Sequence, residues 1–205
     1  MPTERTTAET ILAAAQRSIR RRGPQKLSLS AVAEEAGVSR PTVYRWFPTK
    51  TLLLAAITAY EVEQFDAGLQ ALADRHRDPS ARFDAALRYM VTYLDETIGA
   101  DAISADPTFA LQSLADSLGP HIASVAGVLG DALDQIPAVG SGALTREQGA
   151  EMLLRLAYSH YLVPNRDPDR LLATMRVFAG VEPRRASIRR TSTSRASPGG
   201  DRRQR

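Results

Sequence analysis

The side chains best suited to bind another molecule lie between Ser39 and Lys50. A helix through this segment would turn outward the side chains of Arg40, Thr42, Tyr44, Arg45 and Trp46. No acidic residue interrupts them, although the chain has 23 aspartates and glutamates. Arginine can donate paired hydrogen bonds to guanine, while tyrosine and lysine can hold phosphates. These residue types therefore indicate nucleic-acid binding.

The surrounding residues predict two short helices joined by a tight turn. Ser28 can cap a first helix, whose apolar residues at helical spacing are Leu29, Val32, Ala33 and Ala36. Gly37 ends this helix, because glycine adopts a positive φ without strain. Ser39 caps the next helix, Pro41 is tolerated in its first turn, and Pro48 stops it. This arrangement can place the second helix in the major groove of DNA.

Lys50 lies in the first turn of the following helix, directly after the capping residue Thr49. A cation at this position opposes the helix dipole, so we expect an anion nearby, such as a DNA phosphate. The alternative interpretation is a glycine turn that merely joins packed helices, with the arginines on a solvated face. The absence of acidic residues from the outward face favours the binding interpretation.

Helical patterns cover most of the remaining chain. Helices are predicted at Ala8 to Arg22, Lys50 to about Arg75, Ser80 to Ile98, Pro107 to Leu118, Gly119 to Ile136, Thr145 to Val163 and Pro168 to Phe178, with a flexible loop at 137–143. The three arginines that end the first helix suit its dipole better than DNA contact. Because no convincing alternating strand pattern occurs, we expect an all-α fold. The long helix from Lys50 to about Arg75 would join an N-terminal three-helix domain to a helical body.

Charge divides the chain into three segments. Residues 1–50, the expected helix-turn-helix domain, carry nine Lys or Arg against four Glu. Residues 51–182, the expected helical body, carry nine Arg against eighteen acidic residues. A basic head on an acidic body should present one end to a polyanion. Residues 183–205 hold eight Arg against one Asp and are predicted to be disordered. This segment is either a solubilising extension or a region attracted nonspecifically to DNA.

Two apolar groups in the expected body suggest further binding surfaces. Aromatic and flexible side chains that could line a ligand cavity, or form plain core, are Phe65, Phe83, Tyr89, Met90, Tyr93, Phe109 and Leu114. The last two helices have more apolar residues than one buried face requires. A two-fold dimer could bury the second face, for which the candidates are Leu153, Ala157, Tyr161, Leu171, Met175 and Phe178. A helix central to a monomeric core is the alternative.

The chain offers few residues for catalysis or metal binding. It has no cysteine, and its three histidines, His76, His121 and His160, lie apart without metal-ligand spacing. No phosphate loop or Gly-x-Ser-x-Gly elbow occurs, so we expect no catalytic residue, metal or cofactor. An enzyme with an accessory DNA-binding head and a protein-interaction adaptor are the alternatives. Without a signal peptide or an apolar run long enough for a membrane, a cytoplasmic protein is expected.

The segment AEEAGVSRPTVYRWFPTK, followed by TLLLAAI, resembles the DNA-binding domain of the TetR-type (tetracycline-repressor) family of transcription regulators. The likeness covers about residues 5 to 60 and rests on the glycine turn, Tyr44, the stop at Phe47 and Pro48, and Lys50. It implies an all-helical homodimer whose N-terminal domain binds a palindromic operator. The C-terminal domain of such a protein binds a small apolar effector, and most members of the family are repressors.

The resemblance also assigns roles to individual side chains. It places at base edges Arg40, Pro41 and Thr42, with Arg45 as a further candidate. It places at phosphates Tyr44 and Lys50. Trp46 departs from the family, which often has His or Tyr at this position. An indole donates one hydrogen bond and accepts none, so Trp46 either contacts phosphate through its N–H or packs against the domain.

Overall fold

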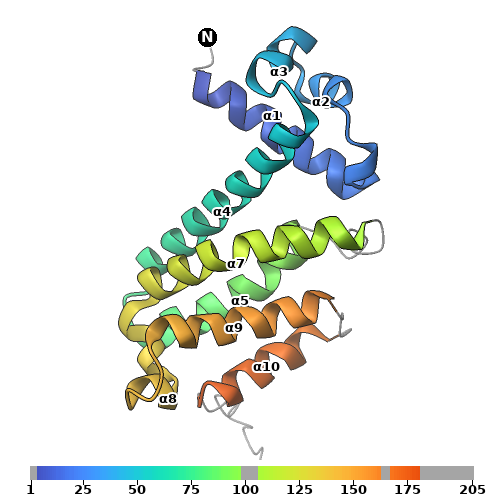
Figure 1. Ribbon diagram of the computed structural model, residues 1–205. Helices are drawn as coiled ribbons and strands as arrows, with labels where there is room; N and C mark the ends of the chain where they lie inside the picture. The colour runs from blue at the N-terminus through green and yellow to red at the C-terminus, as the bar shows by residue number, and fades with distance from the viewer. Residues whose placement is uncertain (1–3, 98–105, 163–166, 181–205) are drawn as a thin grey trace, which may run out of the picture.

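The computed structural model describes residues 4–97, 106–162 and 167–180. Within these ranges the chain forms helices and turns without a strand, which confirms the predicted all-α fold. The helices, in chain order (Figure 1), are α1 (Glu4–Arg22), α2 (Leu29–Ala36), α3 (Arg40–Trp46), α4 (Lys50–Arg75), α5 (Pro79–Thr97), α7 (Pro107–Leu129), α8 (Pro137–Gly140), α9 (Arg146–Leu162) and α10 (Pro168–Phe178). Two short 3₁₀ segments are η1 (Pro24–Lys26) and η2 (Gly130–Gln135).

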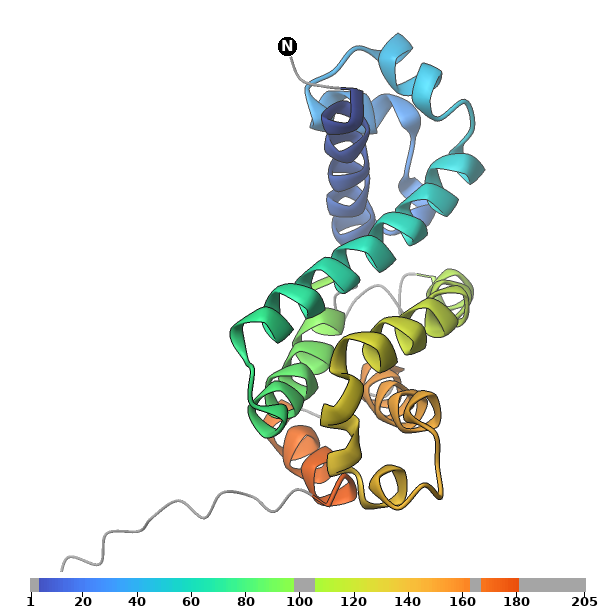
Figure 2. The ribbon, with the colours of Figure 1, turned by 90° about the vertical axis from the view of Figure 1, so that its left-hand side faces the viewer.

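The molecule has a small head and a larger body, joined by α4. The head contains α1, α2 and α3, and the body contains α5 and all the later helices (Figure 1). A view turned by 90° shows α4 running from one part into the other (Figure 2). The predicted long connecting helix therefore exists.

Local sequence signals set the helix ends of the head as predicted. The hydroxyl oxygens of Ser28, Ser39 and Thr49 each accept a hydrogen bond from the backbone N–H three residues later, at 3.2 Å. Such caps stabilise a helix start by about 1 kcal/mol each. Gly37 has φ of 66°, in the left-handed region, and so allows the sharp turn between α2 and α3.

The core of the head extends into α4. Its buried side chains are Ile11, Leu12, Ala14, Ala15, Leu27, Leu29, Val32, Ala33, Val43, Phe47, Leu53 and Ile57. The last two belong to the first turns of α4, so this end of the helix is packed into the head. Farther along the same helix, Phe65 and Leu69 are buried in the separate core of the body. A single helix thus contributes side chains to both cores.

One predicted break in the body was wrong, because α7 continues through Gly119 and Pro120. A proline inside a helix has no N–H for the hydrogen bond and costs about 3 kcal/mol. The buried residues of α7 nevertheless continue at spacings of three and four on both sides of Pro120, from Ala110 to Leu129. Burial of this apolar stripe offsets the cost of the proline. The helix ends instead at Gly130, whose φ is 49°.

The predicted loop at 137–143 was also partly wrong. Residues 137–140 form the single helical turn α8, because Val139 is buried in the core of the body. Gly142, with φ of 77°, then makes the turn toward α9. Nearby, Arg176 of α10 donates two hydrogen bonds to Asp84 of α5, at 3.0 and 2.9 Å, and fixes the last described helix to the body. The predicted disordered tail at 183–205 lies outside the described residues.

Candidate nucleic-acid interface and ligand site

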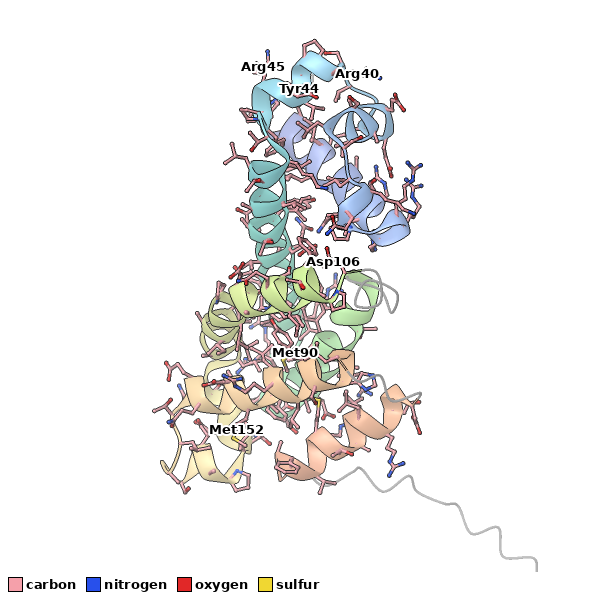
Figure 3. The ribbon with its side chains drawn as sticks, turned by 45° about the vertical axis from the view of Figure 1, so that its right-hand side comes forward. Arg40, Tyr44, Arg45, Met90, Asp106 and Met152 are labelled. Atoms are coloured by element: carbon pink, nitrogen blue, oxygen red, sulfur yellow. The ribbon has the colours of Figure 1, made fainter. Side chains whose placement is uncertain are left out.

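The outward face of α3 lies at the end of the head farthest from the body. Figure 3 shows Arg40, Tyr44 and Arg45 at this end, with Tyr44 and both arginines exposed. Pro41 is also exposed, whereas Thr42 is half-buried and shares a hydrogen bond between its hydroxyl and that of Ser39, at 2.7 Å. Val43 and Phe47 point inward. Of the predicted base-contacting residues, α3 therefore exposes Arg40, Pro41 and Arg45, while Thr42 is partly covered.

The two arginines of this face differ in their surroundings. Nη2 of Arg40 lies 3.4 Å from Oε1 of Glu34, and both side chains are mostly exposed. An exposed ion pair of this kind contributes about 0–1 kcal/mol, so it can exchange for another anion. Arg45 has no ion pair or side-chain hydrogen bond within the described part of the chain. Both guanidinium groups are thus available to a polyanion.

In the absence of DNA, Lys50 forms a hydrogen bond within the protein. Its Nζ donates to the backbone carbonyl of Gln25, at 3.0 Å. The side-chain amide of Gln25 in turn donates to Oδ2 of Asp106, at 2.8 Å. Asp106 is the N-cap of α7, where its Oδ1 accepts from the N–H of Phe109. The hydrogen bonds of Gln25 therefore link the start of α4, through η1, to the body.

Trp46 packs against the core of the head and is half-buried. Its Nε1 is buried and has no hydrogen-bond partner among the described residues. Of the two roles considered from the sequence, this placement favours packing. The indole N–H cannot reach a phosphate from this position, because the atom does not contact solvent.

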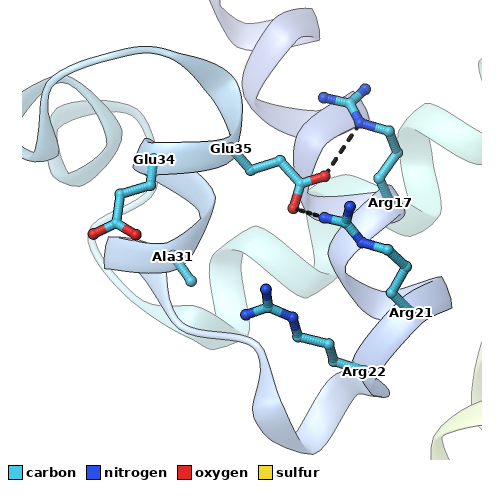
Figure 4. A pocket seen from close by; sticks show the side chains of 6 residues that line it. All are labelled: Arg17, Arg21, Arg22, Ala31, Glu34 and Glu35. Carbon is cyan, nitrogen blue, oxygen red and sulfur yellow. Dashed lines mark hydrogen bonds and ion pairs between the residues drawn. The ribbon is translucent and has the colours of Figure 1, made fainter.

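Arg17, Arg21 and Arg22 of α1 lie on another side of the head, in a cleft between α1 and α2 (Figure 4). Arg17 and Arg21 both donate to the carboxylate of Glu35, the first from Nε at 3.2 Å. Glu35 is mostly buried, so this bridge ties α1 to α2. The sequence predicted that Arg21 would serve the helix dipole, but did not predict its partner in α2. The cleft also includes Arg22, which points between the two helices (Figure 4).

In the body, aromatic rings from three helices meet. The ring centroid of Phe65 on α4 lies 5.4 Å from that of Tyr89, 5.1 Å from Tyr93 and 4.2 Å from His121. A Cβ at Gly68 would lie 2.1 Å from the hydroxyl oxygen of Tyr89. Tyr89 can therefore cross α4 only where glycine leaves space. We call these four rings, together with Tyr158 on α9, the aromatic cluster.

The tyrosine hydroxyls of this cluster bind the backbone of α4. Tyr93 donates to the carbonyl of Glu61 at 2.6 Å, and Tyr89 donates to the carbonyl of Phe65 at 3.0 Å. Each hydroxyl thus forms a direct link from α5 to the helix that enters the head. A rotation of either tyrosine would break its bond to α4.

His121 is the functional candidate that the sequence interpretation missed. Its side chain is 4% exposed, and its Nδ1 lies 2.8 Å from the hydroxyl of Tyr158. Burial lowers the pKa of His121 to about 4, so the ring is neutral at pH 7. The spacing of Ser117, His121 and Val125 on one helix face was the signal that could have indicated burial.

The other predicted ligand residues lie outside the aromatic cluster. Phe83, Met90 and Leu114 are buried in the apolar core of the body. Phe109 is half-buried in the first turn of α7. Of the predicted group, the structure therefore brings Phe65, Tyr89 and Tyr93 into direct ring contact, while the others pack as core or at a helix end. Within the described ranges, no group of three or more His, Cys, Asp or Glu is placed to hold a metal ion.

The predicted dimer surface requires a correction. Leu153, Ala157 and Met175 face the core of their own subunit and are at most 3% exposed. Leu171 is half-buried, and the side chain of Tyr161 lies outside the described part of the structure. The sequence showed apolar residues around most of this helix but could not show which side faces inward.

A neighbouring face of α9 and α10 is the exposed one. Met152 is 46% exposed, and Val177 and Phe178 are each 65% exposed. Leu156, Gly149 and Phe178 line a shallow apolar depression with Met152, which lies on the outer side of the body (Figure 3). The residues that could meet a second subunit are therefore Met152, Leu156, Val177 and Phe178. We call them the α9–α10 face.

Comparison with known proteins finds a family that the head of this chain matches. Residues 11–57, which span α1 to the first turns of α4, match the family described as "Bacterial regulatory proteins, tetR family". This segment is thus a DNA-binding domain of the TetR type. The HTH-type transcriptional regulator EthR of Mycobacterium tuberculosis is 38% identical over 68 residues. That segment covers 33% of this chain and 32% of EthR, so the match spans about a third of this relative's length.

Solved structures of TetR-family proteins share the whole fold. A TetR transcription regulator from Haloarcula marismortui aligns with a TM-score of 0.65 at 21% identity, over 85% of this chain and 96% of that one. The repressor AlkX from a Dietzia strain gives 0.59 at 22% identity, over 83% and 94%. FadR from Bacillus subtilis, in complex with stearoyl-CoA, gives 0.56 at 14% identity, over 84% and 96%. At these identities the likeness concerns the fold alone. No helix among the described residues is long and apolar enough to cross a membrane.

Proposed function

We propose that this protein is a TetR-family transcriptional regulator that binds an operator in double-stranded DNA. The observation that carries the proposal is the exposed face of α3, where Arg40, Tyr44 and Arg45 stand at the end of the head. A helix preceded by a glycine turn and exposing guanidinium groups suits the major groove, where arginine distinguishes guanine from other bases. Lys50 and Tyr44 would bind phosphates and so fix the position of the protein along the duplex.

The operator should be palindromic, because the α9–α10 face can form a two-fold dimer. Met152, Val177 and Phe178 leave an apolar surface on two adjacent helices, and a two-fold axis would bury the same patch on both subunits. The two copies of α3 would then have to lie about 34–36 Å apart to enter successive major grooves.

A small apolar effector bound at the aromatic cluster would change this spacing. α4 packs Leu53 and Ile57 into the head and Phe65 into the aromatic cluster, so a shift of Phe65 is transmitted along a single helix. A protein of this fold can bind a ligand with a long acyl chain, since FadR of Bacillus subtilis was solved in complex with stearoyl-CoA. Release from the operator requires only that the effector bind more tightly to a conformation in which the two copies of α3 do not fit the major grooves than to the DNA-binding conformation. The protein would then act as a repressor.

Selection of bound duplexes from random DNA tests this function. We expect an enriched palindrome whose half-sites are separated by about one helical turn. Binding to it should weaken steeply between low and moderate salt, because phosphate contacts release counterions. Failure to enrich any sequence would support the alternative of a protein-interaction adaptor. An enzymatic role has no comparable support, since the described residues that meet in the body are aromatic rings and one neutral imidazole.

A further inference from the structure

The buried imidazole of His121 has a polar atom without a partner. Its Nε2 has no contact with solvent and no hydrogen bond among the described residues. Native proteins satisfy the large majority of buried polar side-chain atoms, because an unpaired one costs about 1–3 kcal/mol. The atom lies inside the aromatic cluster, with Phe65 at 4.2 Å between ring centroids on one side of the imidazole. A hydrogen-bonding ligand would remove this cost.

The pairing with Tyr158 indicates which hydrogen-bonding role Nε2 has. If the Tyr158 hydroxyl donates to Nδ1, the ring proton lies on Nε2 and one donor is unpaired. If Nδ1 donates to the tyrosine, both the hydroxyl hydrogen and the lone pair of Nε2 are unpaired. The first arrangement leaves fewer unsatisfied groups, so Nε2 is a donor that lacks an acceptor.

The surroundings of this donor favour an uncharged ligand. The rings around His121 belong to Phe65, Tyr93 and Tyr158. Burial alone accounts for the lowered pKa of His121, with no contribution from a neighbouring charge. A carboxylate brought to this place would lose its hydration without meeting a cation, which costs several kcal/mol.

We propose that the effector of this protein is an uncharged, largely apolar molecule with one carbonyl-type oxygen, which accepts a hydrogen bond from Nε2 of His121. This inference rests on the effector site of the proposed function and names the chemical class of its ligand. Nε2 of His121 anchors the oxygen while the Tyr158 hydroxyl holds the imidazole at Nδ1, and the apolar part of the ligand replaces ring contacts of Tyr93. Because Tyr93 is half-buried and its hydroxyl holds the carbonyl of Glu61, moving it opens the cluster and frees α4 at the same time.

Calorimetric titration of the full chain, without DNA, tests the ligand class. The probes are methyl esters from hexanoate to dodecanoate, alkanes of matched length and the corresponding carboxylates. We expect an ester to bind about tenfold more tightly than its matched alkane, as one satisfied buried donor predicts. The carboxylate should bind more weakly than the ester. Equal binding of ester and alkane, a preference for the carboxylate, or no binding of any ester would overturn the proposal.

Replacing the imidazole separates the hydrogen bond from the shape of the site. H121F keeps a planar ring of similar size but removes Nε2, so the ester should lose its advantage while alkane binding stays unchanged. The double variant H121F/Y158F also removes the hydroxyl that would lose its acceptor and guards against misfolding of the single variant. H76F, the same substitution at the end of α4, is the matched control and should keep the ester preference. A preference that survives in H121F would contradict the role of Nε2.

The position of the ring proton of His121 can be measured directly. Nuclear magnetic resonance of nitrogen-labelled protein distinguishes a protonated Nε2 from a protonated Nδ1, and we expect the former at neutral pH. The ester should shift this signal, and protonation at Nδ1 would overturn the assignment of a donor. Binding of ester without selection of any DNA would refute the regulatory function alone. Selection of DNA without ester binding would refute the ligand class alone.

Discussion

The side-chain amide of Gln25 donates to Oδ2 of Asp106 at 2.8 Å, and so joins the turn after α1 to the N-cap of α7. The backbone carbonyl of the same glutamine accepts from Nζ of Lys50. α7 also carries His121, fifteen residues farther along. The head is therefore connected to the proposed effector site by this bridge as well as by α4, and the bridge ends at a residue proposed to hold phosphate.

Truncation of the two partners should have unequal effects on stability. Gln25→Ala removes one exposed hydrogen bond and leaves the backbone carbonyl that holds Lys50, so the free energy of unfolding should fall by less than about 1 kcal/mol. Asp106→Ala also removes the cap of α7, where Oδ1 accepts from Phe109, and should cost about 1–2 kcal/mol. Urea denaturation measures both. Equal losses would show that the cap contributes nothing.

Stability should depend on pH through Glu61, which lies where α4 passes α1. Its Oε1 accepts from Nε2 of Gln16 at 3.3 Å. Burial raises the pKa of Glu61 to about 7, against the opposing effects of Gln16 and of the charge on Arg20. The unfolded chain ionises this carboxyl near its ordinary pKa of 4.5, whereas the folded chain resists ionisation. Its contribution to stability is therefore complete below pH 4.5 and is lost as the pH rises to about 7.

Glu61→Gln removes the group that ionises. Relative to the parent, this variant should gain about 1–2 kcal/mol in the free energy of unfolding above neutral pH, and little below pH 4.5. Denaturation by urea across this range checks the difference. Glu63→Gln, on the exposed side of the same helix, is the matched control and should show no such change with pH. A gain that is independent of pH would contradict the assignment to ionisation.

The α9–α10 face should control the oligomeric state. Phe178 is 65% exposed in the single subunit, and Phe178→Asp would place a charge in the proposed interface. We expect sedimentation equilibrium to show a dimer for the parent and a monomer for this variant at micromolar concentration. Leu52→Asp changes a similarly exposed residue in the first turn of α4, beside the head, and should leave the dimer intact. A parent protein that sediments as a monomer would refute the two-fold arrangement.

Short-range signals made the head predictable from the sequence. Ser28, Gly37 and Ser39 act through their own backbone neighbourhood, so their residue types indicate helix ends directly. Exposure of Arg40 and Arg45 followed from the inward positions of Val43 and Phe47 on the same short helix. The partner of Lys50 did not follow, because Gln25 approaches it only in the folded chain.

The body was less predictable, because its decisive contacts join distant helices. Local rules predict that a helix ends at Pro120, yet α7 continues through it because its apolar stripe packs into the core on both sides of the proline. His121 gave no signal on its own, since its burial depends on Phe65 and on Tyr158, 37 residues farther along the chain. The inward side of α9 could not be chosen either, because its apolar residues occupy most of the circumference and only packing distinguishes Leu153 from Met152.

The proposed roles of Arg40 in base contact and of Lys50 in phosphate contact can be tested with single substitutions. Arg40→Ala should weaken the free energy of binding to the selected operator by about 1–3 kcal/mol. It should have little effect on operators in which the base contacted by Arg40 has already been changed. Lys50→Ala should weaken all sequences alike and lower the salt slope by about one. Arg22→Ala, in the cleft between α1 and α2, is the matched control and should do neither.

The most direct measurement is the affinity of the parent, Arg40→Ala and Lys50→Ala for the selected operator and for each of its single-base variants, at two salt concentrations. If α3 reads the operator, the loss caused by Arg40→Ala will vary with the base at one position in each half-site, and the loss caused by Lys50→Ala will be uniform. Uniform losses from both variants would contradict base reading by α3 and leave only nonspecific attraction to DNA.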